Sequence, residues 1–279
     1  MLTSLAAYSS WESAQILAIS ERGVQFDPIQ IRNIEGLGPV KADVNTSPLG
    51  SIDGETFVGA HTPKRNIVLT VGLNPDWDDW SMESLRRLLY TYFMPKRPIK
   101  LVFKSDDDFP DVTISGYTES VEPNIFAKDV EIQISILCPD PYFTAVEPTI
   151  VNGNVGGGIK TIVYNGTIET GYTVKVTQIV PPDAALITIR TGDPFTSEFF
   201  VTCTISATKY LLVNSIPGDK YVRNIELNTG IITNLLYQVS PGYVWPLLIP
   251  GPNKINILSN VPAIVAAYQI SYFEKFGGL

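Results

Sequence analysis

The sequence has very little of what an enzyme or a metal site requires. Its 279 residues include a single histidine, His61, and two cysteines, Cys138 and Cys203. A Ser-His-Asp or Cys-His catalytic site would have to be built on His61, whose segment Gly59-Ala-His-Thr-Pro63 contains no nucleophile motif. No CxxC spacing or His/Cys cluster offers a zinc ligand set. We therefore expect a protein that is not an enzyme and that has no metal and no cofactor.

Charge is scarce as well. Charged residues make up 17% of the chain, and 20 basic against 28 acidic side chains give a net charge of −8. No basic run exceeds a pair, which excludes stable nucleic-acid binding through clustered Lys and Arg and disfavours an anionic membrane surface. No apolar stretch approaches the ~20 residues of a membrane span, and the N-terminus lacks the basic region of a secretory signal.

Two acidic clusters remain as weak candidates for calcium. The first is Asp76, Asp78 and Asp79, and the second is Asp106, Asp107 and Asp108. Neither has the alternating acidic spacing, with glycine and a closing glutamate, of an EF-hand loop. The second is better interpreted as a hydrated hairpin tip. A glycosidase carboxylate pair stays open in principle, but no feature selects which two acids would form it.

What the sequence does contain is strand periodicity. Ile67, Leu69, Val71 and Leu73 alternate on one face, as do Val130, Ile132, Ile134 and Ile136. Between these strands, Leu85, Leu88, Leu89, Tyr92 and Phe93 form an apolar stripe that predicts a helix over 83–93. Ser81 or Asp79 would cap this helix, and Pro95 would end it.

The second half shows no helical stripe. Short alternating segments separated by Gly, Pro and Asn predict strands over 172–179, 185–190, 199–206, 209–213, 221–227, 234–239, 254–258 and 267–273, which is typical of a β-sandwich. Residues 151–158, rich in glycine, are predicted to be a flexible linker. We expect two domains, residues 1–146 and residues 147–279, in a mainly β chain with one α-helix.

The order of these segments resembles the distal tail protein (Dit) family of siphophages. The resemblance rests on Ile34-Glu-Gly-Leu-Gly-Pro39, Ile52-Asp-Gly54, Arg65-Asn-Ile-Val-Leu69 and Cys138-Pro-Asp-Pro-Tyr-Phe143 in the first half. In the second half it rests on Tyr164-Asn-Gly166, Ile249-Pro-Gly-Pro-Asn-Lys-Ile255 and Tyr272-Phe-Glu-Lys-Phe-Gly-Gly-Leu279. It implies an N-terminal ring-forming (belt) domain of β-sandwich type and a C-terminal galectin-like β-sandwich.

The resemblance also implies a structural hub at the tip of the virion tail, assembled in the host cytoplasm as a ring of six subunits. Its partners would be the tail tube protein and the tail-associated or central fibre protein, with receptor-binding proteins on the outer domains. DNA would pass through the lumen only in transit, and an acidic protein suits such a lumen.

Candidate contacts between subunits lie in an irregular loop over 41–62 and in the hairpin tip over 105–110, since a ring needs arms that reach a neighbour. They are Asp43, Asn45, His61, Asp106, Asp107 and Asp108. Trp77 and Trp80 could be interface anchors or could cover the helix start within their own domain.

A second function, from another class, is a carbohydrate-binding adsorption module in which the C-terminal sandwich recognises a host surface glycan, with Trp245 as the stacking residue. A glycan hydrolase hidden in the sandwich ranks below both.

Overall fold

The computed structural model describes residues 2–9, 17–18, 28–50, 53–75, 80–105, 109–124, 130–180, 184–204, 208–261 and 265–279. The chain forms two compact units. The first contains Met1–Val146 together with Phe276–Leu279, and the second contains Glu147–Lys275. The sequence had assigned the last four residues to the second domain, but they return to the first unit. The prediction of a mainly β protein is confirmed.

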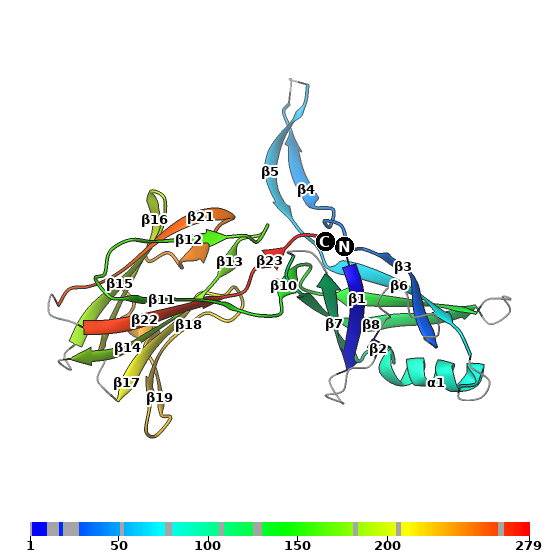
Figure 1. The fold of residues 1–279 in the computed structure, drawn as a ribbon. Helices are drawn as coiled ribbons and strands as arrows, with labels where there is room; N and C mark the ends of the chain where they lie inside the picture. Colours follow the sequence, from blue (N-terminus) through cyan, green and yellow to red (C-terminus); the bar gives the residue numbers. More distant parts are fainter. Residues whose placement is uncertain are drawn as a thin grey trace. The chain divides into compact units, whose positions relative to one another are not determined.

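The first unit is built on an antiparallel sheet whose strands differ in length (Figure 1). Its strands follow the order β2-β1-β7-β8-β9-β6-β3, and β10 pairs with β8 outside this path. Their bounds are β1 Leu2–Ser9, β2 Leu17–Ala18, β3 Ile29–Glu35, β6 Arg65–Leu73, β7 Pro98–Ser105, β8 Val112–Asn124, β9 Glu131–Cys138 and β10 Phe143–Ala145. The long-range pairing of β6 with β9 aligns the two alternating apolar rows that the sequence shows.

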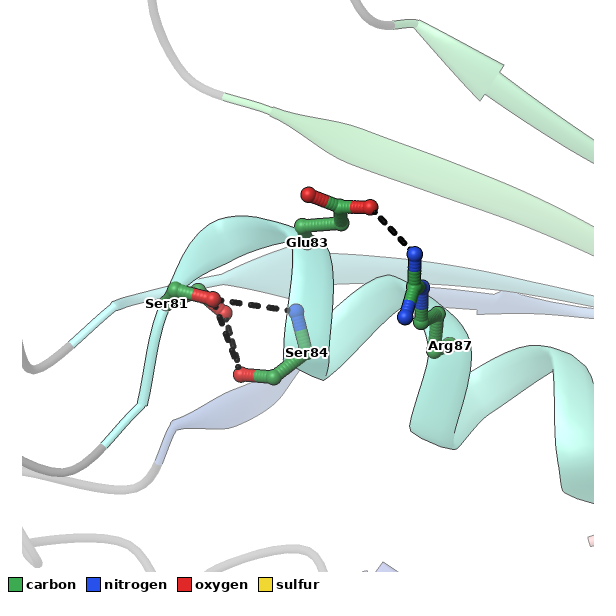
Figure 2. A network of polar contacts seen from close by, with 4 residues as sticks. All are labelled: Ser81, Glu83, Ser84 and Arg87. Atoms are coloured by element: carbon green, nitrogen blue, oxygen red, sulfur yellow. Dashed lines mark hydrogen bonds and ion pairs between the residues drawn. The ribbon is translucent and has the colours of Figure 1, made fainter.

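Helix α1, Met82–Tyr92, confirms the predicted helix. The Ser81 hydroxyl caps it by accepting from the Ser84 amide at 3.2 Å, as Figure 2 shows. Glu83 and Arg87 pair one turn apart on its exposed side, with 2.7 Å between Oε1 and Nη2. Leu85 and Leu89 point inward and are fully buried in the core of the first unit. The apolar stripe thus fixes the helix to the sheet.

The second unit is a two-sheet structure around one apolar core. A six-stranded sheet has the order β11-β22-β14-β17-β18-β19, and a four-stranded sheet has the order β12-β21-β15-β16. Strands β13 and β20 form a separate pair. The bounds are β11 Thr149–Asn154, β12 Lys160–Tyr164, β13 Thr170–Gly171, β14 Thr173–Val180, β15 Ala184–Gly192, β16 Phe195–Thr204, β17 Lys209–Asn214, β18 Tyr221–Glu226, β19 Ile232–Asn234, β20 Leu247–Leu248, β21 Gly251–Ser259 and β22 Val265–Tyr272. The short strand β23, Lys275–Phe276, instead pairs with β10 and so joins the nine-stranded sheet that contains β8.

Two predictions for the second half were wrong. The glycine-rich segment is not a linker over its whole length, because Thr149–Asn154 pairs with β22 along six residues. Glycine suits position 153 because a Cβ there would lie 2.4 Å from both Cζ and the hydroxyl oxygen of Tyr268. Residues 234–239 are not a strand either, since Leu236–Gln238 forms a short 3-10 helix, η1. The prediction that this sandwich is galectin-like remains a prediction.

Candidate assembly surface

A two-stranded hairpin stands apart from the main sheet of the first unit. Among the described strands, β4 (Asp43–Pro48) and β5 (Glu55–His61) pair only with each other, and they extend away from the body of the unit in Figure 1. The sequence predicted an irregular loop here, which was wrong. The segment Glu55-Thr-Phe-Val58 contains β-favouring residues that could have indicated a strand. The ladder contains a bulge between Asn45 and Thr46, which locally increases its twist.

This hairpin exposes apolar side chains that no core of its own covers. Phe57 is 64% exposed and Val58 is 67% exposed, while Val44 and Leu49 are also solvent-facing. An isolated two-stranded hairpin is marginally stable in water, and contiguous exposed apolar groups on an arm usually mark an interaction surface. The sequence had indicated the polar residues of this segment as subunit contacts, but not these apolar ones.

Asp43 and His61 face each other at the base of the hairpin. They form the first residue pair of the β4–β5 ladder, and the His61 Nε2 lies 3.5 Å from the Asp43 carboxylate. Both side chains are exposed. Asn45 lies two positions further along β4, opposite Gly59. Three of the six residues predicted to be subunit contacts therefore lie on this one hairpin.

The other candidates are more scattered. Trp80 lies just before α1 with its side chain 40% exposed. Trp77 and Asp106–Asp108 lie outside the described residues, so their roles as an anchor and as subunit contacts stay predictions.

Among the described residues, we find neither a reactive thiol nor a cluster of metal ligands. Cys138 and Cys203 are buried free thiols, and burial raises the pKa of Cys138 to about 11 and that of Cys203 to about 12. A thiol needs to be a thiolate to act as a nucleophile, so both are poor candidates. Over the parts of the chain that the structure describes, no three His, Cys, Asp or Glu side chains gather as a possible metal site.

Arg65, at the start of β6, is the unexpected polar centre of the first unit. It is only 2% exposed, and its guanidinium donates to four backbone carbonyls: Pro141 at 2.6 Å, Gly36 at 2.5 Å, Gly38 at 2.7 Å and Gly277 at 2.5 Å. The planar group also lies over the Phe143 ring, 4.5 Å from its centre. Desolvation lowers the Arg65 pKa, and the carbonyl ligands replace the water that burial removes.

This centre joins three distant segments of the first unit. Gly36 has a φ of +85°, and a Cβ there would lie 2.1 Å from the Asn66 carbonyl oxygen, so only glycine fits. The Leu279 amide donates to the Leu37 carbonyl at 3.0 Å. Arg65 and the segment Tyr272–Leu279 both belong to the motifs that resemble the family, but no sequence pattern predicted that they touch.

Trp245 in the second unit packs inside an aromatic group. Its ring centre lies 4.9 Å from that of Phe199 and 5.6 Å from that of Tyr243, and it contacts the core of that unit. Lys220 lies over the ring, 5.6 Å from its centre. Contacts within the second unit therefore cover most of the Trp245 side chain, as expected for a packing role.

None of the described helices is both long enough and apolar enough to cross a membrane. Among curated proteins, none matches the sequence of this chain.

The family comparison bears on the first unit. The sequence model of the phage tail protein RIFT-related domain matches residues 24–138, which include the hairpin, Arg65 and α1.

One solved structure extends the likeness in fold to the whole chain. The Dit protein of SPP1, described as a paradigm of the hub adsorption apparatus in phages that infect Gram-positive hosts, is 14% identical with a TM-score of 0.69. The match covers 98% of this chain and 99% of that one. A chain of the phage P2 baseplate in its activated conformation with Ca is 10% identical, with a TM-score of 0.43 over 97% of this chain and 98% of that one. The first unit therefore carries a phage tail protein RIFT-related domain, and the chain as a whole has the fold of a siphophage distal tail protein, as its sequence had suggested.

Proposed function

We propose that this protein is a non-enzymatic hub of a long-tailed phage tail tip and that it acts as a closed ring, most simply of six copies. The ring would join the tail tube protein above to the tail-associated or central fibre protein below. The second units would stand outside it, where receptor-binding proteins could attach. The protein would be assembled in the host cytoplasm and carried in the virion.

The observation that carries this proposal is the exposed hairpin within a phage tail domain. An arm with Phe57 and Val58 in water is poorly suited to a lone subunit, because exposed apolar area is stabilised by burial. A ring needs head-to-tail contacts in which an arm of one copy meets a different surface of the next. Asp43, Asn45 and His61 would form the polar rim of that contact.

The acidic composition fits DNA transit. With a net charge of −8, the copies of a ring repel a DNA backbone on average, so the DNA could slide without binding tightly. Stable binding to DNA or to a membrane is not part of the proposal.

The test is the mass of the full chain in solution. Light scattering across a range of concentrations should give a particle of several 30.7-kDa chains, and six is the number we expect. A variant with Phe57→Ser and Val58→Ser should shift the mass to one chain while its circular dichroism stays unchanged.

A matched control removes two apolar groups that are equally exposed but lie in the second unit. Ile159→Ser and Val163→Ser replace side chains that are 57% and 61% exposed, and this variant should assemble like the parent. Assembly that survives the hairpin variant would refute the role of the arm. A single chain at every concentration, also when purified tail tube protein is added, would refute the ring.

A further inference from the structure

The outer face of the six-stranded sheet in the second unit has an unusual charge distribution. Strand alternation separates its outward side chains from those in the core. Among the described outward side chains, two are cationic, Lys175 and Arg223, and none is a carboxylate; the others are amide, hydroxyl, aromatic or aliphatic. In a chain with eight more acidic than basic residues, a face without acids stands out.

The two cations lie in one row across the sheet. The strand register aligns Asn152, Gln269, Lys175, Leu212, Arg223 and Asn234 side by side from β11 to β19. Lys175 and Arg223 are separated by two interstrand spacings, about 10 Å. The Gln269 amide donates to the Asn152 side-chain oxygen at 3.3 Å, which orients both amides along the same row.

Each cation lies against an aromatic ring on this face. The Lys175 ammonium lies 4.5 Å from the centre of the Tyr210 ring, and the Arg223 guanidinium lies 3.9 Å from that of Tyr221. Among the residues that the structure describes, neither cation forms an ion pair with a carboxylate. Asp219, in the turn after β17, accepts a hydrogen bond from the Asn214 amide at 3.0 Å. Over this part of the chain, cation–π contact holds the two charges in place and no carboxylate neutralises them.

The row continues into a depression over β11, β22 and β14. This open groove of about 490 Å³ is lined by Asn152, Gly153, Asn154, Lys175, Thr177, Ala267, Tyr268 and Gln269. Its polar atoms are amides, a hydroxyl and an ammonium group, which together both donate and accept hydrogen bonds. The groove is too open for a small apolar ligand but suits a chain that lies along the row.

We propose that this face binds an acidic polysaccharide. The two cations would contact its anionic groups, the paired amides of Asn152 and Gln269 its hydroxyls, and the tyrosine rings the apolar faces of its sugars. This binding goes beyond the assembly role of the first unit and does not depend on ring formation. It also differs from a site built on Trp245, whose ring packs against Phe199 and Tyr243.

The charge pattern favours an acidic glycan over the alternatives. A neutral glycan would gain nothing from Lys175 and Arg223, which pair with no carboxylate among the described residues. The buried centre of a protein–protein interface is usually apolar and poor in charged residues. Duplex DNA requires many clustered cations, whereas this row contains two.

The experiment measures binding of the full chain to three polymers: polygalacturonate, which carries carboxylates, heparin, which carries sulfates, and neutral dextran. Affinity electrophoresis at low and moderate salt should show retardation by the acidic polymers that weakens with salt, and none by dextran. The variant with Lys175→Gln and Arg223→Gln should lose about tenfold in affinity, as expected for two exposed charge contacts.

A matched variant separates the face from general charge. Arg190→Gln and Lys254→Gln also remove one Arg and one Lys from strands of the second unit, but from the four-stranded sheet, where they pair with Glu198 and Asp193. This variant should bind within about twofold of the parent. An Asn152→Ala, Gln269→Ala variant should weaken binding at moderate salt, where simple ion exchange is screened.

The proposal is overturned if neither acidic polymer is bound, if both charge variants lose affinity equally, or if dextran is bound as well as polygalacturonate. Circular dichroism of each variant confirms the fold, and the mass of the particle is measured in parallel. If the full chain binds the acidic polymers but stays a single chain, only the ring proposal is contradicted. If it assembles but binds no acidic polymer, only the glycan site is contradicted.

Discussion

The Arg65 guanidinium donates to the Gly277 carbonyl at 2.5 Å, although 212 positions separate the two residues. The bond ties the last residues of the chain to the start of β6 and closes the first unit. Because the chain leaves for the second unit at Glu147 and returns at Phe276, the first unit cannot be complete until the second unit and residues 276–279 have been made.

Replacing Arg65 should destabilise the first unit strongly. Arg65→Met leaves four carbonyls without their donor, and we expect a loss of about 3 kcal/mol in the free energy of unfolding. Arg65→Lys should recover only part of this, since an ammonium group cannot reproduce the planar fork. Urea denaturation followed by circular dichroism measures both. Arg87→Met, on the exposed side of α1, serves as the control and should change stability by less than about 0.5 kcal/mol.

Truncating the Phe276 side chain should make the first unit unfold before the second. Phe276 is 4% exposed and lies 4.7 Å, centre to centre, from the Phe109 ring in the core of the first unit. Phe276→Ala should cost about 3–4 kcal/mol, as for other buried aromatic residues. Proteolysis followed by mass spectrometry should show cleavage within 1–146 first. Phe57→Ala, which truncates an exposed ring, should leave the protease pattern of the dissociated chain unchanged.

The two thiols should be unreactive in the folded protein. Burial raises the pKa of Cys138 to about 11 and that of Cys203 to about 12, so both stay protonated at neutral pH and are shielded from reagents. A thiol reagent at pH 8 should label neither residue until denaturant is added. Rapid labelling of either thiol in native protein would contradict the burial described here.

The same shifts give a sign for pH dependence. A thiol with a folded-state pKa above its unfolded value stabilises the fold fully below the unfolded pKa, near 9. The contribution from Cys138 should be lost as the pH rises from about 9 to about 11. Thermal unfolding across this range, compared with a Cys138→Ala variant, should show a smaller decrease in the variant.

Replacing the N-cap residue of α1 measures how much this local contact contributes to the stability of the protein. Ser81→Ala removes the acceptor for the Ser84 amide and should cost about 1 kcal/mol. Ser81→Asp should retain most of the stability, because a carboxylate also accepts at a helix N-terminus. Glu83→Gln, which breaks the exposed pair with Arg87, should change it by about 0.3 kcal/mol.

Local sequence patterns predicted the structure well wherever a strand or helix buries only one of its faces. The alternation in β6 and β9 and the stripe on α1 each follow from burial of a single face, so they could be predicted within one or two residues. Patterns failed where both faces of a strand are exposed, as in β4 and β5, or where glycines replace the side chains that carry the signal, as in β11.

By itself, the sequence determined the mainly β class, the helix and the poverty in catalytic groups, because residue type and local periodicity decide these. Only the tertiary structure decided that Arg65 meets Gly277, that the last four residues belong to the first unit, and that the proposed subunit contacts Asp43, Asn45 and His61 stand on one projecting hairpin. It also placed Lys175 and Arg223 in a row without carboxylates. The physical reason is the same in each case: strand register and chain return join residues far apart in sequence, and no local pattern records which distant segment will be the neighbour.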